Sequence, residues 1–281
     1  MKLLFSLSSA VALSLLALGA TSNVVSAAES AYDRILRTGT IRAAYATYPP
    51  LLIKDSNTGK FSGLGFEVLE LTAKKLGLKL QMTEEVSWGT MIEGLRTNRY
   101  DILACPVWAN ATRSRAAYFT RPLFYSVIHA YARTSDKRFD SDIKVLNDPK
   151  YKIATMDGEM AEMITQSDFP KAKRFSLPQM SDVPDMLMSI AMKKADVTFA
   201  EPNAVFYFEK HNPNALRDIT PKRPLRIFPN VFMFNIGEDK LKSMLNTTLD
   251  EISNDGELDS IINKYEPFKG DYLRVAAPYQ R

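Results

Sequence analysis

Apolar and polar residues follow one another along this chain with the spacings typical of strands and helices. Residues 59–77 begin as a turn and continue as a helix, with glutamates in its first turn, lysines in its last turn and Gly77 as a stop signal. Residues 40–50 before this helix and residues 78–85 after it predict strands. The apolar face of the predicted helix is formed by Phe66, Leu69, Ala73 and Leu76.

The same alternation returns in the second half of the chain. Residues 151–164 read as strand, turn and helix, and residues 183–202 read as helix, short link and strand. Strands that alternate with helices predict an α/β fold with a parallel, doubly wound sheet. The remaining predicted elements are a strand at 100–108 and helices at 31–37, 90–98, 238–256 and 257–265.

Two stretches of the chain resemble each other. Each runs from an amphipathic helix through a few polar residues and an aspartate into an apolar strand. A methionine of the helix lies ten residues before the aspartate in both copies, Met91 before Asp101 and Met186 before Asp196. This spacing predicts two lobes of one architecture in tandem. Chance similarity of two helix–strand units is the alternative, because such units are common.

The N-terminus predicts a secretory signal peptide at residues 1–27. Lys2 supplies a positive charge, an almost wholly apolar stretch follows, and small residues at 25–28 offer a cleavage site. A membrane anchor is the alternative, although the apolar stretch is barely long enough to span a bilayer.

Composition narrows the class of protein. Cys105 is the only cysteine, which excludes an internal disulfide and offers no site for a lipid anchor after the apolar stretch. The 46% of hydrophobic residues suffices for one large or two modest domains. The net charge of +4 comes without a long basic run, which argues against a nucleic-acid binder.

Recognisable catalytic and metal motifs are missing from the sequence. The chain has two histidines, His129 and His211, and no clustered cysteines, so we expect no metal site. It has no G-x-S-x-G motif and no glycine-rich phosphate loop, and we expect no cofactor. His129 lies in an apolar segment and is expected to be a packed core histidine.

Several segments together, in order, resemble the polar amino-acid-binding proteins of ABC transporters, the family 3 solute-binding proteins. They span most of the chain after the signal: residues 39–77, Trp88 with 91–103, 111–125, 195–205 and 253–265. The resemblance implies a two-lobed periplasmic-binding-protein fold of type II. Each lobe would be a mixed sheet flanked by helices, and the ligand would be enclosed at the hinge.

The resemblance also implies how the lobes are divided. Two crossover strands are expected near residues 126–131 and 227–234. Lobe one would comprise residues 28–127 and 229–281, and lobe two residues 128–228. The protein would be a monomer in the periplasm that binds a small molecule, does not enter the membrane or bind nucleic acid, and presents the molecule to the permease of an ABC importer.

Ligand-binding roles are implied residue by residue. Arg115 matches the arginine that takes the ligand's carboxylate, and a guanidinium fits a carboxylate through two parallel hydrogen bonds. Glu201 matches the acid of lobe two that receives the amino group, and Tyr48 matches an aromatic side chain that lies on the ligand. The other implied ligand contacts are Trp88, Trp108, Asn110, Thr112, Asp157, Gly158, Glu159 and Met160.

Each of these residues also has a purely structural interpretation. Arg115 alone could be a solvated arginine, Tyr48 and Trp88 could be core aromatics, and Glu201 could cap the helix that follows it. Only their joint order favours the ligand-binding roles.

The chain departs from the family pattern at Trp108, where a small or hydroxyl residue is usual, and at residues 157–160, where glycine and threonines are usual. With Tyr45 and the other aromatics on one wall and Glu159 and Glu201 on the other, we expect a basic or aromatic amino acid or a related amine.

Two other functions stay open from the sequence. One is an enzyme on the same scaffold, such as a cyclohexadienyl or arogenate dehydratase, with Glu159 or Glu201 as general acid. The other is a subunit that reports the ligand to a membrane receptor.

Overall fold

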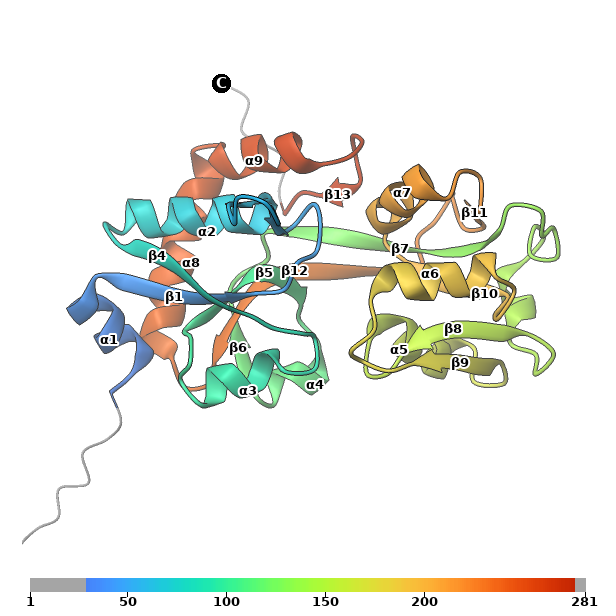
Figure 1. Cartoon of the computed structure of the whole chain (residues 1–281), viewed down its shortest axis with the longest axis horizontal. Helices are drawn as coiled ribbons and strands as arrows, with labels where there is room; N and C mark the ends of the chain where they lie inside the picture. The colour runs from blue at the N-terminus through green and yellow to red at the C-terminus, as the bar shows by residue number, and fades with distance from the viewer. Residues whose placement is uncertain (1–28, 276–281) are drawn as a thin grey trace, which may run out of the picture.

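The fold comes from a computed structural model that describes residues 29–275. The predicted signal peptide lies outside the described residues. Figure 1 shows two lobes side by side, joined by the two long strands β7 (Phe124–Arg133) and β12 (Arg226–Asn235). The helices near both ends of the described chain belong to the same lobe, which we call lobe one.

Lobe one is built on strands in the order β4-β1-β5-β12. β1 pairs in parallel with β4 and β5, and β12 pairs antiparallel with β5. Helices α2, α8 and α9 bury their apolar residues on one face of this sheet, and α3 buries its own on the other face. The elements are α1 (Ala31–Thr38), β1 (Thr40–Tyr45), β2 (Ile53–Lys54), β3 (Phe61–Ser62), α2 (Leu64–Lys75), β4 (Lys79–Glu85), α3 (Met91–Arg96), β5 (Ile102–Trp108), α4 (Ala111–Ser114), β6 (Ala117–Phe119), α8 (Asp239–Asn254), α9 (Glu257–Tyr265) and β13 (Tyr272–Leu273).

Lobe two repeats this arrangement with strands in the order β7-β10-β8-β9. β8 pairs in parallel with β9 and β10, and β7 pairs antiparallel with β10. The lobe has its own hydrophobic core, separate from the two clusters of lobe one. Its elements are the short 3-10 helix η1 (Ile143–Leu146), β8 (Lys152–Met156), α5 (Met160–Asp168), β9 (Lys173–Leu177), α6 (Val183–Ala191), β10 (Val197–Ala200), α7 (Pro202–His211) and β11 (Leu216–Asp218).

The tandem repeat in the sequence is therefore a repeat in the fold. Lobe one runs β1-α2-β4-α3-β5 and lobe two runs β8-α5-β9-α6-β10. Both lobes place the first strand between the second and the third, as in doubly wound sheets. The mixed α/β fold predicted from the sequence is confirmed.

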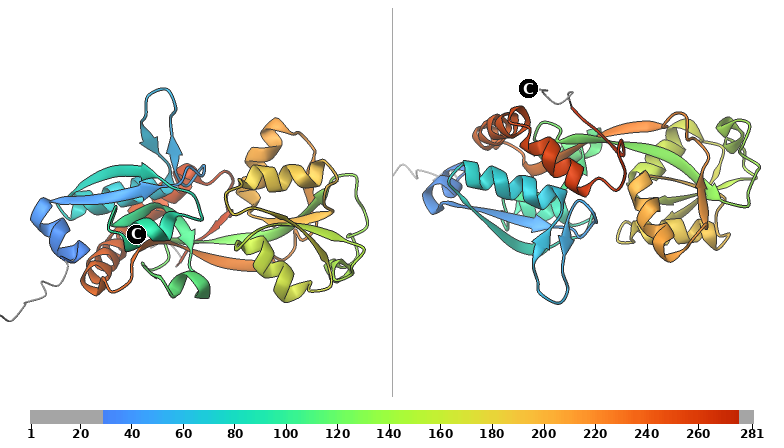
Figure 2. Two further views of the ribbon diagram at one scale, coloured as in Figure 1. Left: turned by 60° about the horizontal axis from the view of Figure 1, so that its bottom comes forward. Right: turned by 90° about the horizontal axis from the view of Figure 1, so that it is seen from above.

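The two crossover strands pair with each other at the hinge. Arg226 to Asn230 of β12 lie antiparallel to Ile128 to Phe124 of β7, and each strand then continues into a different lobe. Figure 2, seen from above, shows both strands running side by side between the lobes. The prediction of two crossover strands is confirmed.

Local sequence explains where the main helices begin. Asp182 and Asp185 form a capping box before α6, in which each side chain accepts a hydrogen bond from the backbone of the other. Helix α2 begins against β5 so closely that a Cβ on Gly65 would lie 2.2 Å from Cδ of Pro106. The apolar face predicted for α2 is rotated in the structure: Leu69 and Ala73 are buried as expected, whereas Phe66 and Leu76 are only half-buried.

Candidate functional site

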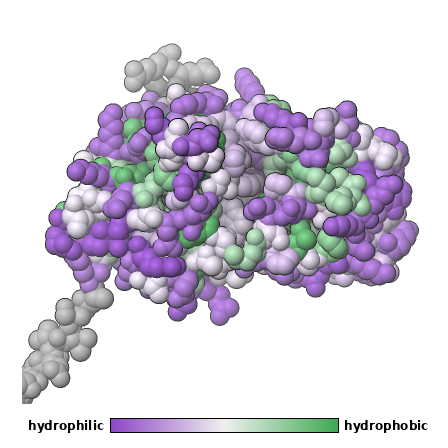
Figure 3. Space-filling model, viewed as in Figure 1, coloured by the Kyte–Doolittle hydropathy of each residue, from purple (hydrophilic) through white to green (hydrophobic). Residues whose placement is uncertain are grey.

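A cavity of about 70 Å³ lies between the lobes, next to the hinge strands. In Figure 3 the surface between the lobes is paler, and therefore less hydrophilic, than the purple flanks of the lobes. Most of the lining side chains are apolar or aromatic, and only Arg113, Glu159 and Glu201 carry charge. The lining residues are Tyr48, Leu51, Trp88, Pro106, Val107, Trp108, Arg113, Met156, Glu159, Met160, Ala161, Val183, Met186, Glu201 and Asn230.

Glu201 is the most buried charged residue of the cavity, at 3% exposed. It follows directly after β10, whose Ala200 pairs with His129 of β7, and it is the N-cap residue of α7. Its Oε2 atom accepts a hydrogen bond of 2.8 Å from the hydroxyl of Tyr48 on lobe one. Among the described residues, its Oε1 atom has no partner in hydrogen-bonding geometry.

Burial and polar neighbours act in opposite directions on Glu201. Burial raises the pKa of this carboxyl above its ordinary value of 4.5, and the nearby polar groups of Ser126, Tyr48 and Trp108 favour the ionised form. Burial of Tyr48 and then the charge of Glu201 raise the pKa of Tyr48, so the Tyr48 hydroxyl stays a hydrogen-bond donor. A buried acid with one free oxygen is suited to receive an N–H group from a ligand.

Aromatic rings form the wall of the cavity opposite α5. Tyr48 and Trp88 meet edge to face, with ring centroids 5.8 Å apart. Trp108 stacks on Phe228 of β12 at 5.3 Å, which anchors its ring to the hinge. Three methionines, Met156, Met160 and Met186, line the same cavity. Such a surface offers a small molecule apolar contact and rings that attract cations.

An ion pair between the lobes closes one end of the cavity. Nη2 of Arg113, from α4, lies 3.0 and 3.1 Å from the two carboxylate oxygens of Glu159, the N-cap residue of α5. Nη1 of Arg113 donates to the carbonyl oxygen of Trp108 at 3.1 Å. The side chains are 9% and 15% exposed, so this pair is shielded from solvent.

Comparison with known proteins supplies the family. The model for "Bacterial extracellular solute-binding proteins, family 3" matches residues 41–268. The chain belongs to this family. A probable amino-acid ABC transporter-binding protein of Haemophilus influenzae is 29% identical over 82% of this chain and 85% of its own length.

Two further comparisons bear on fold and activity. A cyclohexadienyl dehydratase of Pseudomonas aeruginosa is 26% identical over 68% of this chain and 69% of its own length. The crystal structure of an ancestral amino acid-binding protein, a precursor of cyclohexadienyl dehydratase, has a TM-score of 0.72. It covers 84% of this chain and 99% of its own at 23% identity. The family and the type II periplasmic-binding-protein fold predicted from the sequence are therefore confirmed.

In this family 3 protein, six of the predicted ligand contacts line the cavity. They come from both lobes and from the segments that lead to the hinge. They are Tyr48, Trp88, Trp108, Glu159, Met160 and Glu201. Tyr45, which was also expected on the aromatic wall, packs instead against Phe61 in the core of lobe one and accepts a hydrogen bond from Lys54.

Arg115 is not among the residues that line the cavity, whereas Arg113 is. Arg115 is exposed and is the C-cap residue of α4. Two residues on a helix are about 200° apart around its axis, so only one of these arginines can face lobe two. Asn110 is the N-cap residue of α4, and its side chain accepts a hydrogen bond from the N–H of Arg113. This cap fixes where the helix begins, and the start of the helix sets the direction of the Arg113 side chain.

Four other predicted contacts also lie outside the cavity lining. The side chain of Asn110 is used as the helix cap, and Thr112 is exposed on the outer side of α4. Gly158 has a φ of +72° and forms the turn before α5, where its N–H donates to Glu162. Asp157 is exposed and accepts a hydrogen bond from the hydroxyl of Ser176. The polar groups of Asn110, Asp157 and Gly158 therefore make hydrogen bonds within their own lobe, and none of the four residues lines the cavity.

The lining residues missed from the sequence are mostly apolar. Met156, Val183, Met186 and Ala161 belong to strand and helix ends of lobe two, where apolar patterning alone predicts core. Asn230 of β12 is 1% exposed and donates to the hydroxyl of Ser126, so it ties the two hinge strands together beside the cavity. The sequence did contain a signal for Arg113. Asn110 is a strong helix-capping residue, and the helix that begins after it sets the direction of the Arg113 side chain.

A wider groove of about 810 Å³ adjoins the cavity and shares Tyr48, Trp88 and Val183 with it. The part of the chain that the structure describes contributes three acids, one histidine and no lysine or arginine to the groove lining. The acids are Glu85, Asp182 and Asp185. Glu85 has a cation nearby, since Nζ of Lys54 lies 3.7 Å from its carboxylate.

Residues 29–275 contain no group of three histidine, cysteine, aspartate or glutamate side chains placed to hold a metal ion. None of the helices within that range has the length and apolar character needed to cross a membrane.

Proposed function

We propose that this protein is a periplasmic, monomeric solute-binding protein that captures a small organic molecule with a positively charged amino group. It then presents this molecule to the permease of an ABC importer. The delivery step is supported by the family and by the Haemophilus influenzae relative, whose name assigns it to an amino-acid ABC transporter.

One observation supports a positively charged amino group on the proposed ligand. Glu201 is buried in the cavity, and in the described chain its Oε1 atom lacks a hydrogen-bond partner. An ionised carboxylate is costly to bury unless a charge or a donor pairs with it. A ligand ammonium group beside Oε1 would supply that partner, and the face of Trp88 or Trp108 would hold its cationic end.

Ligand capture requires the lobes to open and close about β7 and β12. We propose that residues 28–127 with 229–281 move as one body and residues 128–228 as the other. Two contacts across the cleft, Tyr48 with Glu201 and Arg113 with Glu159, support a closed conformation. X-ray scattering with and without saturating ligand tests this, and identical curves would contradict hinge closure.

The binding step is tested by calorimetry with a panel of amines and amino acids. Glu201→Gln should weaken binding of the best ligand by about 30-fold or more, because losing one partner of a buried charge pair costs roughly 2–5 kcal/mol, at about 1.4 kcal/mol per decade. Glu70→Gln is the matched control, since Glu70 is exposed on α2 away from the cleft. Equal affinities for the two variants would overturn the role of Glu201.

We further propose that the cavity performs no chemistry on its ligand. An enzymatic activity is worth testing for two reasons. One relative is a cyclohexadienyl dehydratase, and a general acid needs a carboxyl with a raised pKa, as Glu201 has. Incubation of the protein with arogenate provides the test. Consumption of arogenate that Glu201→Gln or Glu159→Gln abolishes would show an enzyme instead.

Delivery and localisation need separate measurements. Cells that lack this gene should lose uptake of the ligand identified by calorimetry, and normal uptake would leave a binding or sensing role without import. Mass spectrometry of the exported protein should find an N-terminus at residue 28 or 29. An intact N-terminus would contradict the cleaved signal peptide.

A further inference from the structure

We infer that the ligand of this cleft is an organic cation without a carboxylate, because Glu159 already occupies the guanidinium that would bind one. This inference rests on the proposed function and names the chemical class of its ligand. The juxtaposition that carries it is Arg113 of lobe one facing Glu159 of lobe two inside the cavity.

The donors of Arg113 that face the cleft are already used by the protein. Nη2 contacts both carboxylate oxygens of Glu159, and Nη1 donates to the carbonyl oxygen of Trp108. Because Nη2 contacts both oxygens of Glu159, a ligand carboxylate could pair with Nη2 only by displacing the carboxylate of Glu159. Glu159 is part of the same molecule and is fixed at the start of α5, so it competes at a high effective concentration.

Displacement would also leave Glu159 without its partner. Its side chain is 15% exposed, and the other donor near it, Nε2 of Gln179, lies at 3.5 Å, the limit of a hydrogen bond. Removing the partner of a largely buried charge destabilises a protein strongly. The N-terminus of α5 also favours a negative charge at Glu159.

The charge of the cavity points to the same class of ligand. One arginine and two glutamates line it, so when all three are ionised one negative charge, that of Glu201, is left unbalanced. A ligand of net charge +1 neutralises this charge, whereas a net-neutral zwitterion such as tyrosine does not. The adjoining groove has Asp182 and Asp185 in its lining, although the chain as a whole carries a net charge of +4.

The rest of the lining suits the body of an organic amine. Tyr48, Trp88 and Trp108 offer aromatic faces and edges, and the three methionines on the lobe-two side offer adaptable apolar contact. The predicted clamp for a ligand carboxylate is therefore replaced by an internal carboxylate, and the ligand keeps only the ammonium end and the apolar body.

The test uses pairs of probes that differ only in the carboxylate: tyramine and tyrosine, cadaverine and lysine, agmatine and arginine. Calorimetry on the unmodified protein should show, in the pair that binds best, at least tenfold tighter binding of the amine. Glu159→Gln should reduce or reverse this preference, because it frees Arg113 for the amino acid's carboxylate. The double variant Arg113→Ala with Glu159→Gln should not gain affinity for the amino acid.

The outcomes separate this inference from the proposed function. Tighter binding of the amino acid than of its amine by the unmodified protein would overturn the inference and leave the proposed function standing. An unchanged preference in a folded Glu159→Gln variant, verified by its thermal unfolding, would also overturn the inference. Absence of binding for all six probes would count against the proposed function itself.

Discussion

Asp101 of lobe one and Asp196 of lobe two stand in the same place, immediately before the third parallel strand of their sheets. In each lobe the N–H of the aspartate donates to a carbonyl oxygen of the first strand, at 2.9 Å to Arg42 and 2.7 Å to Lys152. In each lobe the carboxylate accepts the N–H of that same residue, at 2.7 and 2.9 Å. The aspartate therefore extends the pairing of the first and third strands by one residue.

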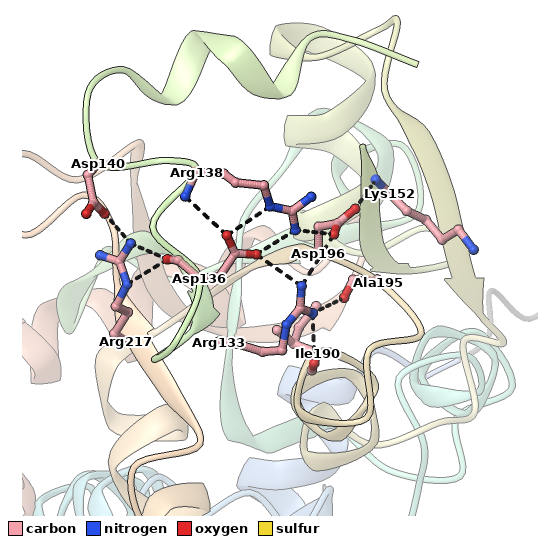
Figure 4. Close-up of polar contacts among 9 residues, drawn as sticks. All are labelled: Arg133, Asp136, Arg138, Asp140, Lys152, Ile190, Ala195, Asp196 and Arg217. Atoms are coloured by element: carbon pink, nitrogen blue, oxygen red, sulfur yellow. Dashed lines mark hydrogen bonds and ion pairs between the residues drawn. The ribbon is translucent and has the colours of Figure 1, made fainter. Parts of the chain in front are cut away.

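The lobes differ in how they neutralise this charge. The side chain of Asp101 is 1% exposed and lies between two arginines, Arg34 and Arg42. The side chain of Asp196 is 20% exposed and belongs to a network at the surface of lobe two, which Figure 4 shows. There it shares Arg133 and Arg138 with Asp136.

This difference shows that equal spacing in the sequence does not imply equal energetic weight. In lobe two the neighbouring Asp136 and Arg138 can redistribute their hydrogen bonds, and Arg133 is also held by the carbonyl oxygens of Ile190 and Ala195. In lobe one the two arginines around Asp101 are its closest opposite charges, and the carboxylate that they flank is 1% exposed. Burial decides the cost of losing the charge.

The largest expected effect tests the comparison of Asp101 with Asp196 directly. Asp101→Ala should lower the free energy of unfolding by about 3–5 kcal/mol, because it leaves two partly buried arginines without their partner. Asp196→Ala should cost only about 1–3 kcal/mol, the range for hydrogen bonds to a charged group. Urea unfolding followed by circular dichroism measures both, and equal losses would contradict the role given to burial.

The junction of the lobes supplies the next prediction, at Asp271 of the C-terminal segment. Asp271 is 2% exposed, and within residues 29–275 its carboxylate oxygens find no partner in hydrogen-bonding geometry. Burial, then the nearby charges of Glu201 and Glu266, raise the pKa of Asp271 to about 8. The unfolded chain ionises this group near 3.8.

Between about pH 4 and pH 8 the folded state therefore holds a proton that the unfolded state has released. Stability should fall as pH rises through this window, by at most about 1.4 kcal/mol per pH unit from this group. Asp271→Asn should flatten the fall and be the more stable variant at pH 8. Melting temperatures between pH 5 and pH 8 test it, and parallel curves for the two proteins would contradict the raised pKa.

A smaller effect concerns the helix that follows the first strand of each lobe. The second residue of this helix is Gly65 in α2 and Ala161 in α5. Gly65→Ala should cost about 1–3 kcal/mol by overpacking against Pro106, whereas Ala161→Gly should cost only about 0.5–1 kcal/mol. Chemical unfolding of both variants provides the measurement. A neutral Gly65→Ala would show that α2 can shift away from β5.

The smallest expected effect is at Arg115. Because this side chain is exposed and does not line the cavity, Arg115→Ala should change the free energy of unfolding by no more than about 0.5 kcal/mol and leave ligand affinity unchanged. Arg113→Ala should lower the melting temperature clearly, since it strands Glu159 in the cavity. If the two variants behaved alike, the structure would give no reason to prefer Arg113 over Arg115, the residue predicted from the sequence.

The sequence by itself determined the fold class, the repeated order of strands and helices and the family. These follow from local periodicity, helix-end signals and the order of segments along the chain, all of which are properties of neighbouring residues. It also identified six of the lining residues, including Glu201 and Tyr48. The short strand β9 was not predicted, because its segment lacks a clear apolar period.

Only the tertiary structure decided which charges meet in the cleft. Arg113 and Arg115 differ by two places in the sequence, but the direction of a side chain depends on where α4 begins and how it faces lobe two. Arg113 and Glu159 are 46 residues apart, and the packing of the two lobes places Nη2 of Arg113 3.0 Å from the carboxylate of Glu159. The chemistry of the site depends on this contact between lobes, and no local pattern encodes it.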